Sequence, residues 1–321
     1  MFTDTHCHIT YLEERGIDTA RVLRSLALKG TPFVLDAGIK AGDLTERIAY
    51  VNKTAAAADA LGDDAEDDSA GGKNAFSGGA NACADSGVPS GLQSMPDAVH
   101  GAIDDAHSLR QSIDALFRFA AGIWPDRQAV SARVEQVGIL ERQFGSCTDG
   151  RVCALGECGL DHYWEPDTID YAGEAELFEM QLALACKLNL PVIVHSRCAF
   201  EATLSCIQNF PQACGVIHCY SYGINEARAF LDAGWYISFS GSVTYAKKTA
   251  LKDIEDLIRF VPENRLLVET DSPYLAPVPL RGKPNTPLFI EHTYRFIAEK
   301  RNASVQSLAD TVFKNARALF G

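Results

Sequence analysis

Short apolar, β-branched runs alternate along the chain with longer segments whose apolar residues recur every three or four positions. Eight runs have the length of strands and lie at residues 2–8, 33–38, 117–124, 152–161, 191–197, 215–221, 235–241 and 266–272. Helical patterns such as 173–188 lie between them. Strands that alternate with helices of this length form parallel βα units, and eight such units close into a barrel. The pattern predicts an α/β fold, the (β/α)8 TIM barrel, with an open doubly wound sheet as the alternative.

One segment interrupts this rhythm. Residues 61–105 are rich in Ala, Gly, Asp, Ser and Asn and carry almost no large apolar side chains, so they cannot bury enough surface to form a core. We predict a single barrel domain over residues 1–321 with a flexible, acidic, low-complexity insertion at 61–105, between the second helix and the third strand. In a barrel that position lies on the amino-terminal face, away from the chemistry.

Charge and hydropathy restrict the partners of the chain. The net charge is −13, and residues 61–100 contribute seven acidic residues against one lysine. A broad basic surface for nucleic acid is therefore excluded, and any such contact must depend on bound cations and a few basic side chains. The first residues show no signal-peptide pattern, and no apolar run approaches the ~20 residues that span a bilayer. We expect a cytoplasmic monomer without membrane contact. Because no GxGxxG motif follows the first strand, we expect no dinucleotide cofactor.

The ten cysteines form no CxxC pair and suggest no disulfide framework. Cys7, Cys158 and Cys219 each stand directly beside a histidine or glutamate of the candidate site described next. Because neighbouring residues of a strand point to opposite faces, we expect all three thiols to face the helical layer as buried apolar groups.

Metal-binding side chains occur where the predicted strands end. His6 and His8 are separated by one residue, so both imidazoles project from the same face of the first strand. Further candidates end four other strands: Glu157, His195, His218 and Asp271. Each could be a structural residue alone, but the carboxyl ends of barrel strands converge on one mouth, where barrel active sites are built. Six such groups buried together without a cation would be costly.

Four imidazoles and two carboxylates exceed what one ion needs, which indicates two divalent ions such as Mg²⁺, Mn²⁺ or Zn²⁺. We expect Glu157 to bridge them. Paired metals generate hydroxide near neutral pH and stabilise the attacking and leaving oxygens of a displacement. Asp271 is placed to accept the proton of the bridging water. Glu157 and Asp271 are thus the predicted catalytic residues, in a hydrolase that acts through a metal-bridging hydroxide.

Several motifs resemble the TatD family of metal-dependent hydrolases, which belongs to the amidohydrolase-like barrels. The matching segments are DTHCH (4–8), GECGLDHYW (156–164), VIVHSR (192–197), IHCYS (217–221), LLVETDSPYLAP (266–277), RGKPN (281–285) and NARALFG (315–321). Apart from the insertion, the resemblance covers the whole chain.

This resemblance implies a TatD-type deoxyribonuclease that cleaves phosphodiester bonds of DNA, often exonucleolytically from 3′ ends, with Mg²⁺, Mn²⁺ or Zn²⁺. It also implies a division of the ligands between two ions. The first ion would be held by His6, His8, Glu157 and Asp271, and the second by Glu157, His195 and His218.

The chain departs from the family at one position. Members usually carry GxHP after the third strand, whereas residues 122–125 read GIWP, so that Trp124 replaces a histidine that faces substrate. Trp124 could stack on a base or line the mouth as an apolar wall. Arg197, on the same side of its strand as His195, is a candidate phosphate ligand or a salt-bridge partner. Tyr220 and Tyr274 are further candidates for substrate contact, although core packing is the favoured interpretation for a tyrosine.

Three functions therefore remain open. The leading one is a two-metal nuclease acting on DNA. The second is a metal-dependent hydrolase of a small ester, amide or phosphate on the same barrel. The third is a non-catalytic binding protein, which the complete ligand set disfavours.

Overall fold

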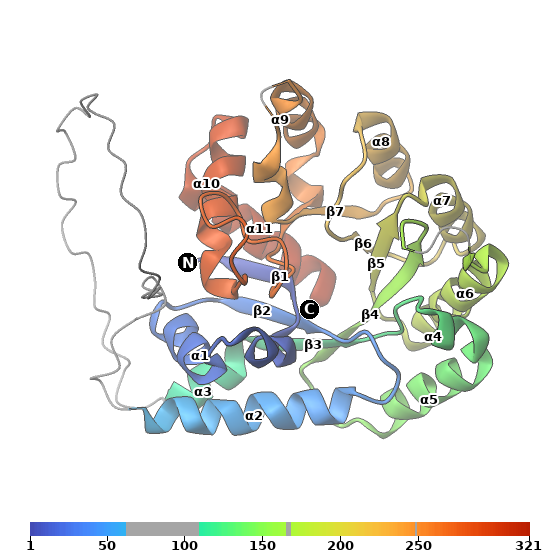
Figure 1. Ribbon diagram of the computed structural model, residues 1–321, viewed down its shortest axis with the longest axis horizontal. Helices are drawn as coiled ribbons and strands as arrows, with labels where there is room; N and C mark the ends of the chain where they lie inside the picture. The colour runs from blue at the N-terminus through green and yellow to red at the C-terminus, as the bar shows by residue number, and fades with distance from the viewer. Residues whose placement is uncertain (62–108, 165–167, 248) are drawn as a thin grey trace, which may run out of the picture.

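The computed structural model is a barrel of eight parallel strands with helices outside it, and it describes residues 1–61, 109–164, 168–247 and 249–321 (Figure 1). Each strand pairs with the next one along the chain, from β1 to β8. The strands are β1 (Thr3–Cys7), β2 (Phe33–Ala37), β3 (Phe117–Ala121), β4 (Val152–Asp161), β5 (Val192–Arg197), β6 (Gly215–Ile217), β7 (Tyr236–Phe239) and β8 (Leu266–Val268). The predicted TIM barrel is confirmed.

The helical layer surrounds these strands. Its helices are α1 (Thr19–Leu28), α2 (Leu44–Ala60), α3 (Leu109–Leu116), α4 (Arg127–Ser131), α5 (Arg133–Ser146), α6 (Tyr171–Leu188), α7 (Phe200–Asn209), α8 (Ile224–Asp232), α9 (Leu251–Phe260), α10 (Ile290–Arg301) and α11 (Val305–Phe320). The strand interiors are almost fully buried, as in β2 and β8, because the barrel lumen covers one face and helices cover the other. Among the described residues, no helix is long and apolar enough to cross a membrane.

The barrel closes where the chain beyond β8 meets β1. The amide of Asp271 donates to the carbonyl of His6 over 2.9 Å, and the amide of His8 donates to the carbonyl of Ser272 over 2.8 Å. The buried carboxylate of Asp4 accepts from both the amide and the hydroxyl of Thr270, at 2.9 and 2.6 Å. These contacts fix Asp271 between the two histidines of β1, at the carboxyl end of the barrel.

All eight predicted strands are present, but several are shorter than the apolar runs suggested. β6 ends at Ile217 and β8 at Val268, so His218 and Asp271 lie in the loops that follow. Helix α6 begins at Tyr171, two residues before the predicted start, because the carboxylate of Asp170 accepts from the amide of Gly173 and caps it. The insertion predicted at 61–105 lies outside the described residues except for Leu61, which ends α2.

Candidate metal centre

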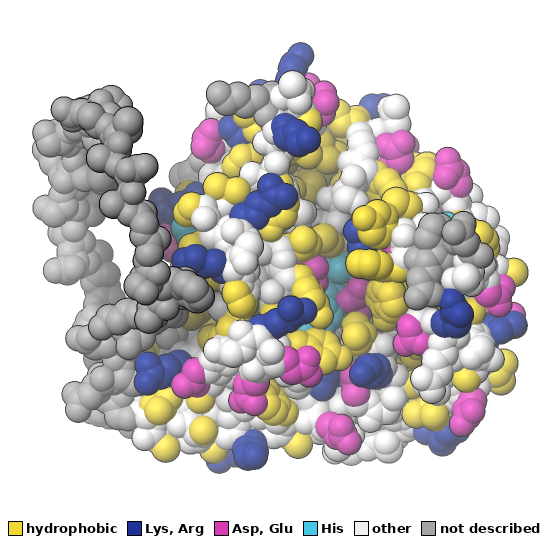
Figure 2. Space-filling view, in the orientation of Figure 1, with side chains coloured by type: hydrophobic (Ala, Val, Ile, Leu, Met, Phe, Trp, Pro, Cys, Tyr) yellow, Lys and Arg dark blue, Asp and Glu magenta, His cyan; other side chains and the backbone are white. Residues whose placement is uncertain are grey.

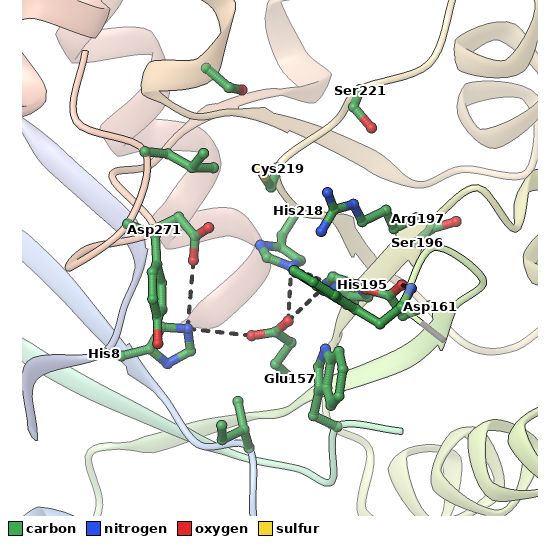
Figure 3. A pocket seen from close by; sticks show the side chains of 16 residues that line it. His8, Glu157, Asp161, His195, Ser196, Arg197, His218, Cys219, Ser221 and Asp271 are labelled. Atoms are coloured by element: carbon green, nitrogen blue, oxygen red, sulfur yellow. Dashed lines mark hydrogen bonds and ion pairs between the residues drawn. The ribbon is translucent and has the colours of Figure 1, made fainter. Parts of the chain in front are cut away.

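The six predicted ligands converge at the mouth of the barrel, around the carboxylate of Glu157. Figure 3 labels all of them except His6. Glu157 comes from β4 and is 4 % exposed, whereas His6 from β1 is fully buried. The mouth opens as a hollow with histidine and acidic side chains on its floor and hydrophobic side chains around it (Figure 2). Sequence positions more than 250 residues apart thus share one polar site, as the sequence predicted.

One carboxylate oxygen of Glu157 faces the imidazoles of His6, in β1, and of His8, directly after it. Its Oε2 lies 3.2 Å from His6 Nε2 and 3.4 Å from His8 Nε2, and these two nitrogens are 3.2 Å apart. The Oδ1 atom of Asp271 completes this group at 3.5 Å from His8 Nε2 and 3.7 Å from His6 Nε2.

The other oxygen of Glu157 faces a second pair of imidazoles. Its Oε1 lies 3.0 Å from His195 Nδ1 and 3.1 Å from His218 Nε2, with 3.3 Å between the two nitrogens. Donor atoms that bind one tetrahedral ion at about 2.0–2.1 Å lie roughly 3.3 Å from each other. Both groups of donors therefore have the spacing that a bound cation requires.

Two further carboxylates hold the second pair in place. Asp161 Oδ2 lies 2.9 Å from His195 Nε2, and its Oδ1 accepts from the amides of Tyr163 and Trp164. Glu269 Oε1 lies 3.3 Å from His218 Nδ1 and accepts from the amide of Cys219 over 2.6 Å. Such outer carboxylates fix the tautomer and orientation of a metal-binding imidazole.

The electrostatics of the site favour bound positive charge. Burial raises the pKa of Glu157, but the charge of His218 and hydrogen bonds from His195 and His218 outweigh it and hold this pKa well below its usual range. Burial lowers the pKa of His8, but its bonds to Asp271 and Glu157 raise it well above the usual value. The carboxylates thus raise the pKa of His8, His195 and His218, whereas burial and the charge of His218 lower that of His6. A metal ion that binds these imidazoles competes with protons for the same nitrogens.

Two of the candidate substrate residues, Trp124 and Arg197, lie at the pocket above the centre. This pocket has a volume of about 620 Å³. The ring of Trp124 stands edge-on to His195 at 5.8 Å, and the guanidinium of Arg197 lies 3.7 Å over the ring of Tyr163. The same guanidinium lies 5.4 Å from the centre of the Trp164 ring, so two aromatic rings contact it at the edge of the pocket.

Two predictions at the mouth were wrong. Tyr220 is only 3 % exposed, and its hydroxyl donates to the carbonyl of Gly223 rather than facing the pocket. Cys219 lines the pocket instead of facing the helical layer. Both errors have one cause, because β6 ends at Ile217 and Cys219 has a positive φ of 45°, which breaks the alternation of a strand. Cys7 and Cys158 are fully buried, as predicted.

The sequence predicted no role for Glu269 or Trp164. Glu269 could have been found, because it lies two residues before Asp271 in a buried segment where carboxylates are rare. Trp164 lines the pocket and is 58 % exposed, but an isolated exposed aromatic residue gives no such signal in a sequence. Tyr274 also lines the pocket and is 43 % exposed, so this tyrosine is not packed in the core.

A parallel barrel with imidazoles and carboxylates gathered at the carboxyl ends of its strands defines a metal-dependent hydrolase. The profile of the family described as TatD related DNase matches residues 3–321. The chain belongs to this TatD family.

Individual relatives agree with this assignment. The chain is 39 % identical over 204 residues to the uncharacterized metal-dependent hydrolase YcfH of Escherichia coli, which covers 63 % of this chain and 73 % of that protein. It is 36 % identical over 178 residues to the 3′-5′ ssDNA/RNA exonuclease TatD of Pantoea ananatis, covering 53 % and 66 % of the two chains. The crystal structure of the TatD homologue YJJV from Escherichia coli shares the fold, with a TM-score of 0.68 at 22 % identity over 99 % of this chain and 97 % of that one.

We expect replacement of Asp161 by asparagine to lower kcat/KM about 10–100-fold, the usual cost of losing an outer carboxylate. The amide keeps the size of the side chain, but it can present an N–H to His195 Nε2 where the carboxylate accepts. Turnover and metal titration would be measured beside Asp232→Asn, an exposed change at the end of α8. Equal metal affinity in both variants would contradict the orienting role of Asp161.

Proposed function

We propose that this chain is a two-metal phosphodiesterase that removes nucleotides from the 3′ ends of DNA. The observation that carries the proposal is the position of Glu157, whose two oxygens face two separate groups of imidazoles. His6, His8 and Asp271 would hold one ion with Glu157 Oε2. His195 and His218 would hold the other with Oε1. Divalent ions bound there would activate water at neutral pH and stabilise negative charge on the attacking and leaving oxygens.

The protein's own residues supply the remaining steps. Asp271 lines the pocket with its carboxylate 3.5 Å from His8, so it can accept a proton from water at the floor of the site. Arg197 can donate to a non-bridging phosphate oxygen, because its planar guanidinium matches a phosphate and lies on the ring of Tyr163. Trp124 lines the pocket next to His195, where its apolar ring would exclude water.

Nucleic acid is the favoured substrate for three reasons. A relative is named as an exonuclease acting on single-stranded DNA and RNA. Exposed aromatic residues stand at the pocket, and stacking on such rings is the usual way to hold single-stranded bases. The mouth also presents the cationic group of Arg197 beside the acidic floor. Hydrolysis of a small ester or phosphate is the second candidate, since Trp124 narrows the mouth where the family carries a histidine.

The test uses the full chain loaded with Mn²⁺ or Mg²⁺ and single-stranded oligonucleotides labelled at the 5′ end. A ladder of products shortened one nucleotide at a time is the expected result, and a 3′-phosphorothioate linkage should block it. Intact oligonucleotides together with turnover of small esters would overturn the nuclease assignment and favour the second candidate.

A further inference from the structure

A second pocket adjoins the metal centre and takes no part in the mechanism above. Its volume is about 540 Å³, within the range of about 300–1,000 Å³ for small-molecule sites. It shares Trp124, Asp161 and Trp164 with the pocket over the metals. A substrate whose scissile bond lies over the metal centre could therefore extend into this second pocket.

Two aromatic side chains line this second pocket. Trp124 follows β3 and Trp164 follows β4, and both indole rings line the pocket. Trp164 is 58 % exposed, an unusual position for the largest apolar side chain. Flat aromatic surfaces of this kind bind the π-face of a base, with about 1–3 kcal/mol per stacked base.

The lining of the pocket is also acidic. It presents Asp126, Asp161, Asp170 and Glu174, with Arg127 as the basic residue. Three of these carboxylates are occupied by the fold: Asp126 and Asp170 accept from the amides that begin α4 and α6, and Asp161 binds His195. The excess of negative charge repels a phosphate, so the pocket suits the uncharged, donor-bearing part of a nucleotide.

Glu174 is the carboxylate left for a ligand. It is 5 % exposed, and within the described part of the chain its Oε2 atom has no hydrogen-bond partner. Its neighbour is His162, whose Nε2 lies 3.5 Å from this oxygen. The two form an ion pair only when this imidazole is protonated, and burial lowers the pKa of His162. Burial also raises the pKa of Glu174 to about 7, against a hydrogen bond from the backbone of Asp161 that lowers it. A buried acceptor of this kind is costly unless a bound group satisfies it.

We propose that this pocket binds a nucleobase with an exocyclic amino group, stacked against Trp124 and Trp164, and that Glu174 accepts a hydrogen bond from that group. The proposal rests on the nuclease function and specifies its preference. Cytosine and adenine carry an amino donor, whereas thymine carries a carbonyl oxygen at the corresponding position. That oxygen would face the carboxylate and be repelled, so thymine should be disfavoured although its ring stacks equally well.

The first experiment compares kcat/KM for short oligo(dC) and oligo(dT) at pH 8, which differ in this amino group but not in ring size. We expect a preference for oligo(dC) of about tenfold, typical of one base-specific polar contact. Glu174→Gln should reduce this ratio to near one, because an amide both donates and accepts. Glu176→Gln is the matched control, since Glu176 lies on the same helix but is 54 % exposed and pairs with Arg133.

A second measurement is independent of turnover. Trp235 is 1 % exposed, so quenching of tryptophan fluorescence by added nucleotides reports Trp124 and Trp164. We expect dCMP to quench this fluorescence at a lower concentration than dTMP. Trp164→Ala should remove most of the difference between the two nucleotides. Because Trp164 is exposed, this variant provides a test even if Glu174→Gln does not fold. Equal quenching by dCMP and dTMP in the unaltered protein would overturn the base preference. Failure to cleave either oligonucleotide, with the quenching difference intact, would instead count against the nuclease function alone.

Discussion

Replacing Glu157 with glutamine is expected to lower turnover on the order of 10³-fold, the loss seen when an enzyme loses a group that organises charge at the reacting centre. The two carboxylate oxygens of Glu157 lie 3.0–3.4 Å from four imidazole nitrogens, so one side chain serves both donor groups. Glutamine keeps the shape but is neutral, and its NH₂ group donates where one of the two carboxylate oxygens accepts. Both groups of donors should therefore lose affinity for cations together.

The measurement is turnover together with elemental analysis of the metal bound per chain. Glu179→Gln on α6 is the control, because that glutamate bonds to Asn209 outside the site. Thermal unfolding of the metal-free proteins checks that the fold survives the substitution. Normal metal content and normal turnover in Glu157→Gln would show that the central position of this carboxylate is not functional.

The fold and the ligand set follow from local rules that a sequence exposes. The period-two alternation of a strand puts His6 and His8 on one side of β1, and parallel strands in sequential order bring their carboxyl ends to one mouth. The motifs shared with the TatD family contain the same histidines and carboxylates, so the resemblance and the strand pattern predict the same ligands. Because these rules concern spacing and strand order, they hold without knowledge of side-chain contacts.

The same alternation fails wherever the backbone leaves the strand. It predicts that Cys219 points outward and leaves Tyr220 free to point inward, but β6 has ended and Cys219 adopts a positive φ. As a result the thiol faces the pocket and the phenol is buried against Tyr222 and Phe239. Strand length is set by pairing with neighbours, which an apolar run does not reveal.

The outer parts of the site are less visible in the sequence because they are assembled from loops. Trp124 lies after β3, Trp164 lies after β4, and Glu174 lies in the first turn of α6. No periodic pattern in the sequence relates these three positions. Their proximity depends on how two loops and one helix cross above the barrel. Substrate preference is therefore a property of the three-dimensional structure here, whereas the metal ligands are already ordered by strand position.

Replacing Gly159 with alanine is expected to destabilise the protein by about 3 kcal/mol, with contributions from a strained backbone and a steric overlap. Gly159 has a φ of 139°, a conformation that side chains with a Cβ rarely adopt. An added Cβ would lie 2.0 Å from the carbonyl oxygen of His195, on the paired strand β5. Neither strand can move freely, because both belong to the closed barrel, so the overlap must displace His195.

The consequence should reach catalysis as well as stability. A shift near 1 Å at a catalytic group can cost about 10²-fold in rate, so we expect turnover to fall by about that factor at temperatures where the variant is still folded. Thermal unfolding should show a fall in Tm of roughly 5–10 °C. Gly150→Ala is the matched control, since that glycine lacks a left-handed φ and a Cβ there would meet no atom of the described residues within 4 Å. Equal Tm and equal turnover for the two alanine variants would contradict this prediction. Such a result would mean that the paired strands β4 and β5 accommodate a side chain beside His195 without displacing it.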